Sequence, residues 1–253
     1  MDAPDNIGRG KTPKQATGTN DNMAMAATSA STDRPFGPDG ATILATEHWS
    51  LLGTRSLIWN EAMSRTTVFL TVLSASIVAL ALLADATGFG RRTTAVALVL
   101  LPVVFLLGLA TYGRLVQINS EDVAITLAMN RLRYAYLVMA PDLRPYFSTG
   151  HHDDERGVTT TYLLGMGSHL QTWSHFLVTT PTIVATVDAA VATAIVVLAG
   201  LAVETPTAAV VAAGVVAFLV TWGALFSLQR LNLRVLRHAP TRFPTPPDEP
   251  CTS

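Results

Sequence analysis

The stretch "TTVFLTVLSASIVALALLA", residues 66–84, decides the fold class, because no charged side chain interrupts it. A bilayer's hydrocarbon core is about 30 Å thick, and a helix needs about 20 residues to cross it. Three more stretches meet this length, at 93–113, 181–203 and 207–228. Together they hold one charged residue, Asp188. The pattern predicts four transmembrane helices.

The composition agrees with this prediction. Hydrophobic residues make up 49% of the 253 residues and charged residues 14%, against roughly 25% charged in a soluble domain. The expected fold is all-α: a polytopic membrane protein with four transmembrane helices and a helical cytoplasmic insert between spans 2 and 3. The net charge of −1 and the lack of a basic motif give no indication of nucleic-acid binding.

Shifts in composition along the chain predict six regions. Residues 1–40 have few large apolar side chains and are expected to be disordered. Residues 41–65 carry apolar residues at three- and four-residue steps, which is typical of an amphipathic helix, and no breaker separates them from span 1. The regions are a disordered tail (1–40), an amphipathic cytoplasmic helix (41–65), transmembrane hairpin 1 (66–113), a helical cytoplasmic region (114–180), transmembrane hairpin 2 (181–228) and a basic, then Pro-rich, tail (229–253).

The central region is expected to hold two helices of its own. Asn119 and Asp122 have the spacing of a capping box and predict a helix start, and Pro141 predicts its end. A second helix is expected over Val158–Leu177, where apolar residues recur on one face. Within span 2, Pro102 predicts a kink.

Arginine placement predicts the orientation. Cytoplasmic loops of membrane proteins carry an excess of basic residues. Arg91 and Arg92, in the turn between spans 1 and 2, are the contrary signal. The other arginines near the spans crowd the two flanks and the centre: Arg55, Arg65, Arg114, Arg131, Arg133, Arg144, Arg156, Arg230, Arg234, Arg237 and Arg242. The predicted location is the bacterial plasma membrane, with four crossings and both termini in the cytoplasm.

Small residues recur at every fourth position on two spans. In lipid, close approach through small residues supplies much of the contact energy between helices. We therefore expect these stripes to form the seams of a tight four-helix bundle. They are Thr67, Thr71, Ala75 and Ala79 on span 1, and Ala209, Ala213, Ala217 and Thr221 on span 4.

Asp188 is the candidate functional residue. At about 1.5 Å per residue, its position in span 3 lies roughly 10 Å below the cytoplasmic boundary. A carboxylate at such depth costs on the order of 2.5–3.5 kcal/mol and faces a bundle interior or a water-filled path. Two interpretations stay open: a protonated carboxyl bonded to Thr71, Ser74 or Ser76, or a hydrated group in a polar pathway.

The run "HHDDER", residues 151–156, is the other candidate. His151, His152 and Asp153 are metal-ligating residue types, but consecutive residues rarely converge on one ion, so a solvated charged loop is the favoured interpretation. The sequence holds no phosphate-binding loop, nucleophile elbow or zinc-protease motif. It predicts no enzyme, and no cofactor is expected.

The stretches "LATEHWSLLGTRSLIWNEAMSRTTVFL" (44–70), "MNRLRYAYL" (129–137) and "DDERG" (153–157) carry a resemblance. The chain resembles an uncharacterised family of actinobacterial multi-pass membrane proteins over residues 41 to about 230. The resemblance implies the topology and no activity. In layout alone, the chain is similar to bacterial defence effectors in which a helix leads into a membrane hairpin and assembly forms a pore.

Two functional hypotheses follow. In the first, the chain is a membrane scaffold or sensor that binds a partner through its cytoplasmic helices. In the second, it is an oligomeric channel, transporter or pore-forming effector with Asp188 in a polar pathway. The expected partners are the lipid bilayer, a second copy of the chain and a cytoplasmic protein.

Overall fold

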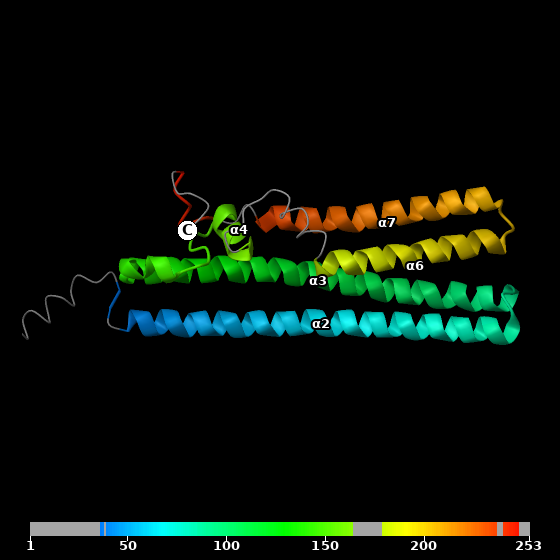
Figure 1. Cartoon of the computed structure of the whole chain (residues 1–253), viewed down its shortest axis with the longest axis horizontal. Helices are drawn as coiled ribbons and strands as arrows, with labels where there is room; N and C mark the ends of the chain where they lie inside the picture. The colour runs from blue at the N-terminus through cyan, green and yellow to red at the C-terminus, as the bar shows by residue number, and fades with distance from the viewer. Residues whose placement is uncertain (1–35, 38, 164–178, 237–239, 248–253) are drawn as a thin grey trace, which may run out of the picture. The chain divides into compact units, whose positions relative to one another are not determined.

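The computed structural model describes residues 36–37, 39–163, 179–236 and 240–247. The described residues form helices: α2 (Gly40–Thr87), α3 (Arg91–Met139), the short 3-10 helix η1 (Pro141–Tyr146), α4 (Glu155–Leu163), α6 (Thr180–Ala202) and α7 (Thr207–Leu236). Four of these, α2, α3, α6 and α7, are long and apolar enough to cross a membrane (Figure 1). The all-α fold with four candidate spans is thus confirmed, and the chain is a multi-pass membrane protein by this criterion.

Helix α2 joins the expected amphipathic helix and span 1 into one element of 48 residues. The sequence from 41 to 87 holds no proline and one glycine, Gly53, so nothing interrupts the helix. The turn after α2 uses Gly88, whose φ of +77° lies in the left-handed region that glycine adopts without strain. The hydroxyl of Thr93 donates to the Gly88 carbonyl at 2.9 Å and fixes this turn.

Helix α3 is also one element, of 49 residues, and this corrects the expected helix start at Asn119. It continues through Pro102 and past Asn119 as far as Met139. Asp122 is buried inside α3 and pairs with a distant arginine, so it does not cap a helix. The expected helix end at Pro141 is confirmed.

Helix α4 begins at Glu155, three residues before the predicted start of the Val158–Leu177 helix. The rest of that prediction, residues 164–178, lies outside the described residues, as does nearly all of the predicted tail at 1–40.

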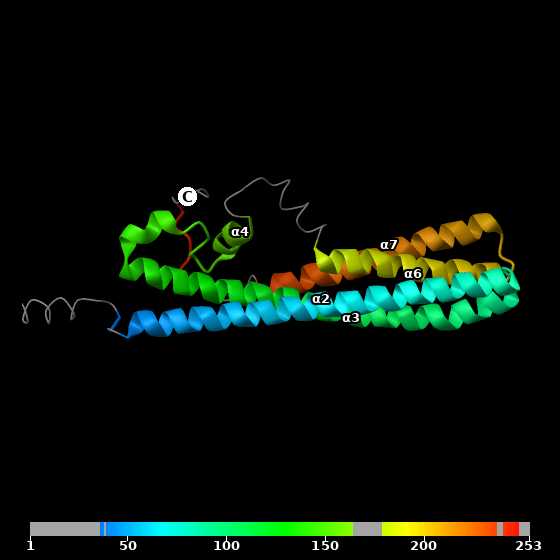
Figure 2. The ribbon, with the colours of Figure 1, turned by 60° about the horizontal axis from the view of Figure 1, so that its bottom comes forward.

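Helices α3, α6 and α7 are the ones that approach most closely. Glycines make this approach possible: Gly214 on α7 faces Val197 and Thr193 of α6, and Gly200 of α6 faces Val210 of α7. From Leu44 on, α2 runs beside α3, as both views show (Figures 1 and 2). Helix α2 turns a buried face inward with Ala62, Phe69, Ser76 and Ala84.

The two predicted stripes do not form the seams within this chain. On α2, the side chains of Thr67, Thr71, Ala75 and Ala79 are exposed and lie on an open, outward-facing side of the helix. On α7, Ala209 and Ala213 are exposed, and Ala217 and Thr221 are half-buried. The buried face of α7 is rotated by one position and carries Val210, Gly214, Leu225 and Gln229. An Ala-rich helix has small residues on more than one face, so spacing alone does not reveal which face is buried.

Candidate functional site

Asp188 is completely buried in α6, with no exposed surface. Among the described residues, neither of its carboxylate oxygens has a hydrogen-bond partner. It lies against Gly108 of α3: a Cβ atom built on that glycine would stand 2.0 Å from Asp188 Oδ1 and 2.9 Å from the ring of Phe69 on α2. Three helices therefore converge on this carboxylate, and glycine leaves the space that the carboxylate fills.

The hydroxyls expected to bond Asp188 do not reach it. Thr71 and Ser74 are exposed on the outer face of α2, and the Thr71 hydroxyl donates to the Thr67 carbonyl at 2.8 Å. Ser76 is buried, but its hydroxyl donates to the Val72 carbonyl at 2.7 Å. The hydroxyls of Thr71 and Ser76 are thus used within α2 itself. Asp188 was placed correctly in the interior, and its expected partners were wrong.

The surroundings of Asp188 are apolar. Phe69, Val104, Val184 and Ala185 belong to the main core cluster around this depth, and each is almost fully buried. Burial disfavours the charged form of a carboxylate in such surroundings, because no donor among the described residues replaces the hydrogen bonds that water makes to it. Among the described residues, the two oxygens of Asp188 and Nδ1 of His48 are the buried side-chain polar atoms without a hydrogen-bond partner.

A second polar site joins α2 to α3 around Asp122, which is 2% exposed. Arg55 of α2 donates to it through Nε at 2.6 Å and Nη2 at 3.2 Å, so the pair is bidentate. Trp59 Nε1 donates at 3.3 Å, and the hydroxyl of Tyr162 on α4 donates at 2.5 Å. Burial and the bond to Asp122 raise the pKa of Tyr162 above its ordinary value. This cluster ties three helices together at one buried charge.

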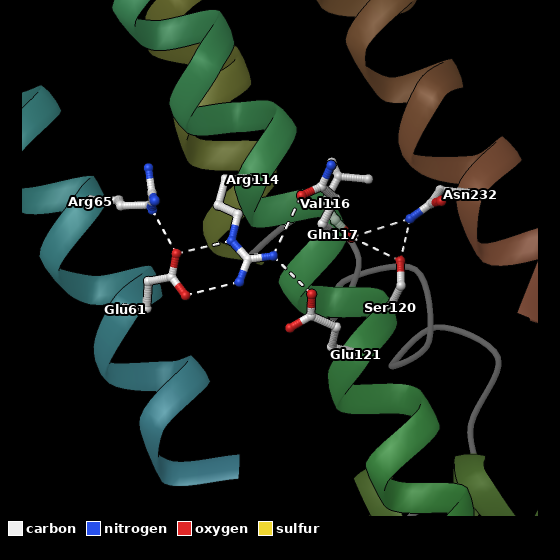
Figure 3. Close-up of polar contacts among 8 residues, drawn as sticks. All are labelled: Glu61, Arg65, Arg114, Val116, Gln117, Ser120, Glu121 and Asn232. Carbon is white, nitrogen blue, oxygen red and sulfur yellow. Dashed lines mark hydrogen bonds and ion pairs between the residues drawn. The ribbon is translucent and has the colours of Figure 1, made fainter. Parts of the chain in front are cut away.

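Closer to span 1, Glu61 and Arg114 form a second link between α2 and α3 (Figure 3). Arg114 donates to both oxygens of Glu61 at 2.9 Å and to Glu121 at 2.8 Å. Arg65 donates to the same Glu61 at 2.8 Å. The hydrogen bonds from Arg114 and Arg65 lower the pKa of Glu61 to about 2, so it stays ionised at neutral pH.

On the other side of α3, Asn232 of α7 donates its side-chain amide to the Val116 carbonyl at 3.2 Å and to the Ser120 hydroxyl (Figure 3). Helix α7 thus stays bonded to α3 beyond its predicted end as a span at residue 228. Together these links join α2, α3 and α7 to one another at the level where the apolar spans end and charged residues begin.

The loop at 151–154 is ordered, which corrects the prediction of a solvated charged loop. His152 and Asp153 are buried, at 8% and 2% exposure. The rings of His151 and His152 lie 4.3 Å apart, but no group of three or more potential ligands could hold a metal ion among the described residues. Asp153 instead pairs with Arg131 at 2.7 Å and accepts backbone N–H groups from residues 242 and 243.

The Pro-rich segment 240–247 therefore does not behave as a free tail. It lies against α3 and the 151–154 loop. This contact could not be predicted from local sequence patterns, because the partners are about 90 residues apart.

Comparison of the chain with protein-family models, with curated proteins and with solved structures finds no match.

Proposed function

We propose that the chain is a scaffold or sensor of the bacterial plasma membrane, which binds a partner protein through helices that extend beyond the bilayer. Both termini and residues 114–180 face the cytoplasm in this proposal, because most arginines near the spans lie in these regions.

The length of α2 and α3 is the observation that carries the proposal. They have 48 and 49 residues, and about 20 residues cross a bilayer. Each helix therefore continues well past its span as a rigid extension. The Arg55–Asp122 pair and the Glu61–Arg114 pair hold the two extensions together. Such an ion-paired extension suits a docking platform, because its shape does not depend on lipid.

The outer face of the α2 extension exposes large apolar side chains. Trp49 is 73% exposed and Leu57 is 70% exposed, and Gly53 lies between them on the same side of the helix. Apolar side chains gathered on a face outside the bilayer mark an interaction surface, and tryptophan is enriched in the energetic centres of interfaces. Trp49 and Leu57 are thus the proposed contacts for the partner.

Site-specific photo-crosslinking in cells tests this proposal. A photoreactive amino acid at Trp49 or Leu57 should give one discrete crosslinked product that contains a second protein. Glu47 is also exposed, but at about 100° per residue it lies about 160° around α2 from Trp49 and ten residues before Leu57, so it is the matched control and should give little of this product. Equal yields at all three positions, or no product at any of them, would contradict the proposal.

A second function is favoured by one observation: the carboxylate of Asp188 is buried and has no hydrogen-bond partner among the described residues. An ionisable residue in a transmembrane helix is expensive and commonly serves an ion or proton path. In this alternative, the chain forms an oligomeric channel, transporter or pore, and α2 moves so that Phe69 uncovers Asp188. Purified protein in liposomes separates the two: the scaffold gives no ion or proton flux, and the alternative requires flux that depends on Asp188.

A further inference from the structure

We propose that the 151–154 loop and Tyr134 form a peptide-binding site, and that its ligand in trans is the 240–247 segment of a second copy of this chain. The site recognises an extended segment with an aromatic residue followed by Pro-Thr. This inference rests on contacts that the proposed partner surface on α2 does not use.

The site binds the backbone of the segment at consecutive positions. Asp153 accepts the N–H of Arg242 at 2.9 Å and that of Phe243 at 2.7 Å. Its own N–H donates back to the Phe243 carbonyl at 3.3 Å. Asp154 accepts the N–H and the hydroxyl of Thr245, each at 2.8 Å. Residue 244 is a proline and has no N–H, so every backbone donor from 242 to 245 is bound and the register is fixed.

Side chains add selectivity to these backbone contacts. The ring of Phe243 stacks on Tyr134 of α3, with centroids 4.3 Å apart and planes 19° apart. His152 Nδ1 lies 3.2 Å from the Phe243 carbonyl oxygen. Stacked aromatic pairs stabilise a contact beyond what the area that they bury accounts for. An aromatic residue at 243 is thus the main side-chain requirement.

The site is built by contacts that do not involve the segment. Arg131 Nε holds Asp153 at 2.7 Å, and Asn130 donates to the His152 carbonyl at 2.9 Å. Asp154 accepts the N–H of Gly157 at 2.8 Å and so caps α4. Because α3 and α4 position both carboxylates, the site keeps its geometry when the segment leaves. A preorganised site pays little ordering cost on binding and can accept the same segment from another chain.

The buried charge of Asp153 also favours a bound segment that donates hydrogen bonds to it. Burial works against the charged form of Asp153, but the backbone N–H groups of Arg242 and Phe243, with Arg131, hold its pKa below the ordinary value. Without the segment, the carboxylate is left with fewer donors, and a buried charge that loses its partners is costly. Residues 240–247 are the one sequence seen to fit this site, so a second copy is the source that we propose.

A complementation experiment with full-length chains tests the exchange. Phe243→Pro removes the stacking ring and one donated N–H, and leaves the site intact. Asp153→Ala disables the site and leaves the segment intact. Each variant loses the contact within its own chain, but a mixed pair retains one good segment and one good site. The mixed pair, carrying different tags in detergent, should therefore co-purify several-fold more strongly than either variant with itself.

The Phe243→Pro, Asp153→Ala double variant is the control, and it should not associate with itself. Tyr134→Ala is a second variant that disables the site, and it leaves the buried carboxylate of Asp153 in place. It is paired with Phe243→Pro in the same way, so the test stands even where Asp153→Ala lowers the yield of folded protein. If the segment is only a structural strap within one chain, neither mixed pair will associate beyond the double variant, and that result would overturn the proposal.

A peptide arm tests the site itself. A labelled peptide of residues 240–247 should bind the Phe243→Pro chain saturably, with a Kd below about 1 mM, the effective concentration that a short linker supplies. Binding should be lost in the double variant. Absence of saturation, or binding that persists without Asp153, also overturns the proposal.

Discussion

Asp188 of α6 fills the space that a side chain on Gly108 of α3 would occupy, since a Cβ atom there would lie 2.0 Å from Asp188 Oδ1. The glycine and the buried carboxylate are therefore one packing unit between α3 and α6. This unit gives the first prediction.

Gly108→Ala should destabilise the protein by about 1–3 kcal/mol, the usual cost of overpacking a filled interior. Gly113→Ala on the same helix is the control: that position is exposed, and nothing lies near its added Cβ. It should be neutral or stabilising, by up to about 1 kcal/mol, because alanine favours a helix. Thermal unfolding in detergent measures both. Equal effects at the two glycines would show that Asp188 does not pack on Gly108.

Asp188→Asn keeps the shape of the side chain and removes its ability to ionise. Because the described residues give Asp188 no hydrogen-bond partner, its loss as a carboxylate should not lower thermal stability. If the alternative function holds, the variant folds normally and loses ion or proton flux in liposomes. A marked fall in stability would instead reveal a bond to Asp188 that the described residues do not contain.

Arg55→Ala should destabilise the protein by about 3 kcal/mol, the lower end of the range for a buried pair broken on one side. The lower end applies because the Arg55 side chain is 28% exposed while that of Asp122 is 3% exposed. Arg65→Ala is the matched control: its pair with Glu61 lies on the surface, and its loss should cost less than about 1 kcal/mol. Chemical or thermal unfolding of both variants under the same conditions provides the comparison, and similar losses would refute the role of Asp122.

The Glu61–Arg114 link predicts a dependence on pH. The folded pKa of Glu61 is about 2, below its ordinary 4.5. A depressed carboxyl pKa gives stability that is present above about pH 4.5 and lost as the pH falls toward 2. Wild type should thus lose more stability than Glu61→Gln over this interval. Melting temperatures of both proteins across it test the sign, and parallel curves would contradict it.

The four spans could be predicted from the sequence because the bilayer sets their length and excludes charge. Burial of Asp188 followed from the same physics. Its expected partners were wrong because the rotation of α2 was not fixed by its composition: Thr71 and Ser74 face outward with the small-residue stripe. The four-residue spacing of small side chains identifies one face of a helix. In an Ala-rich helix it does not show whether that face packs against another helix or points outward.

Other features depend on pairs far apart in the chain. Asp122 fits a local capping pattern, yet it pairs with Arg55, which lies 67 residues away, and α3 continues past Asp122 without a break. The docked segment at 240–247 depends on Asp153, about 90 residues earlier. A single sequence does not reveal such pairs, because each residue also fits a local pattern, such as a helix cap or a charged loop, that gives no hint of its distant partner.

Labelling of single cysteines with a membrane-impermeant thiol reagent tests the proposed topology most directly. Phe89 is 95% exposed in the turn after α2, and Tyr146 is 82% exposed in η1. With Cys251 replaced by serine, Phe89→Cys and Glu204→Cys should be labelled in intact cells. Tyr146→Cys should be labelled only after the membrane is permeabilised. Labelling of Tyr146→Cys in intact cells would place the central region outside and contradict the cytoplasmic platform.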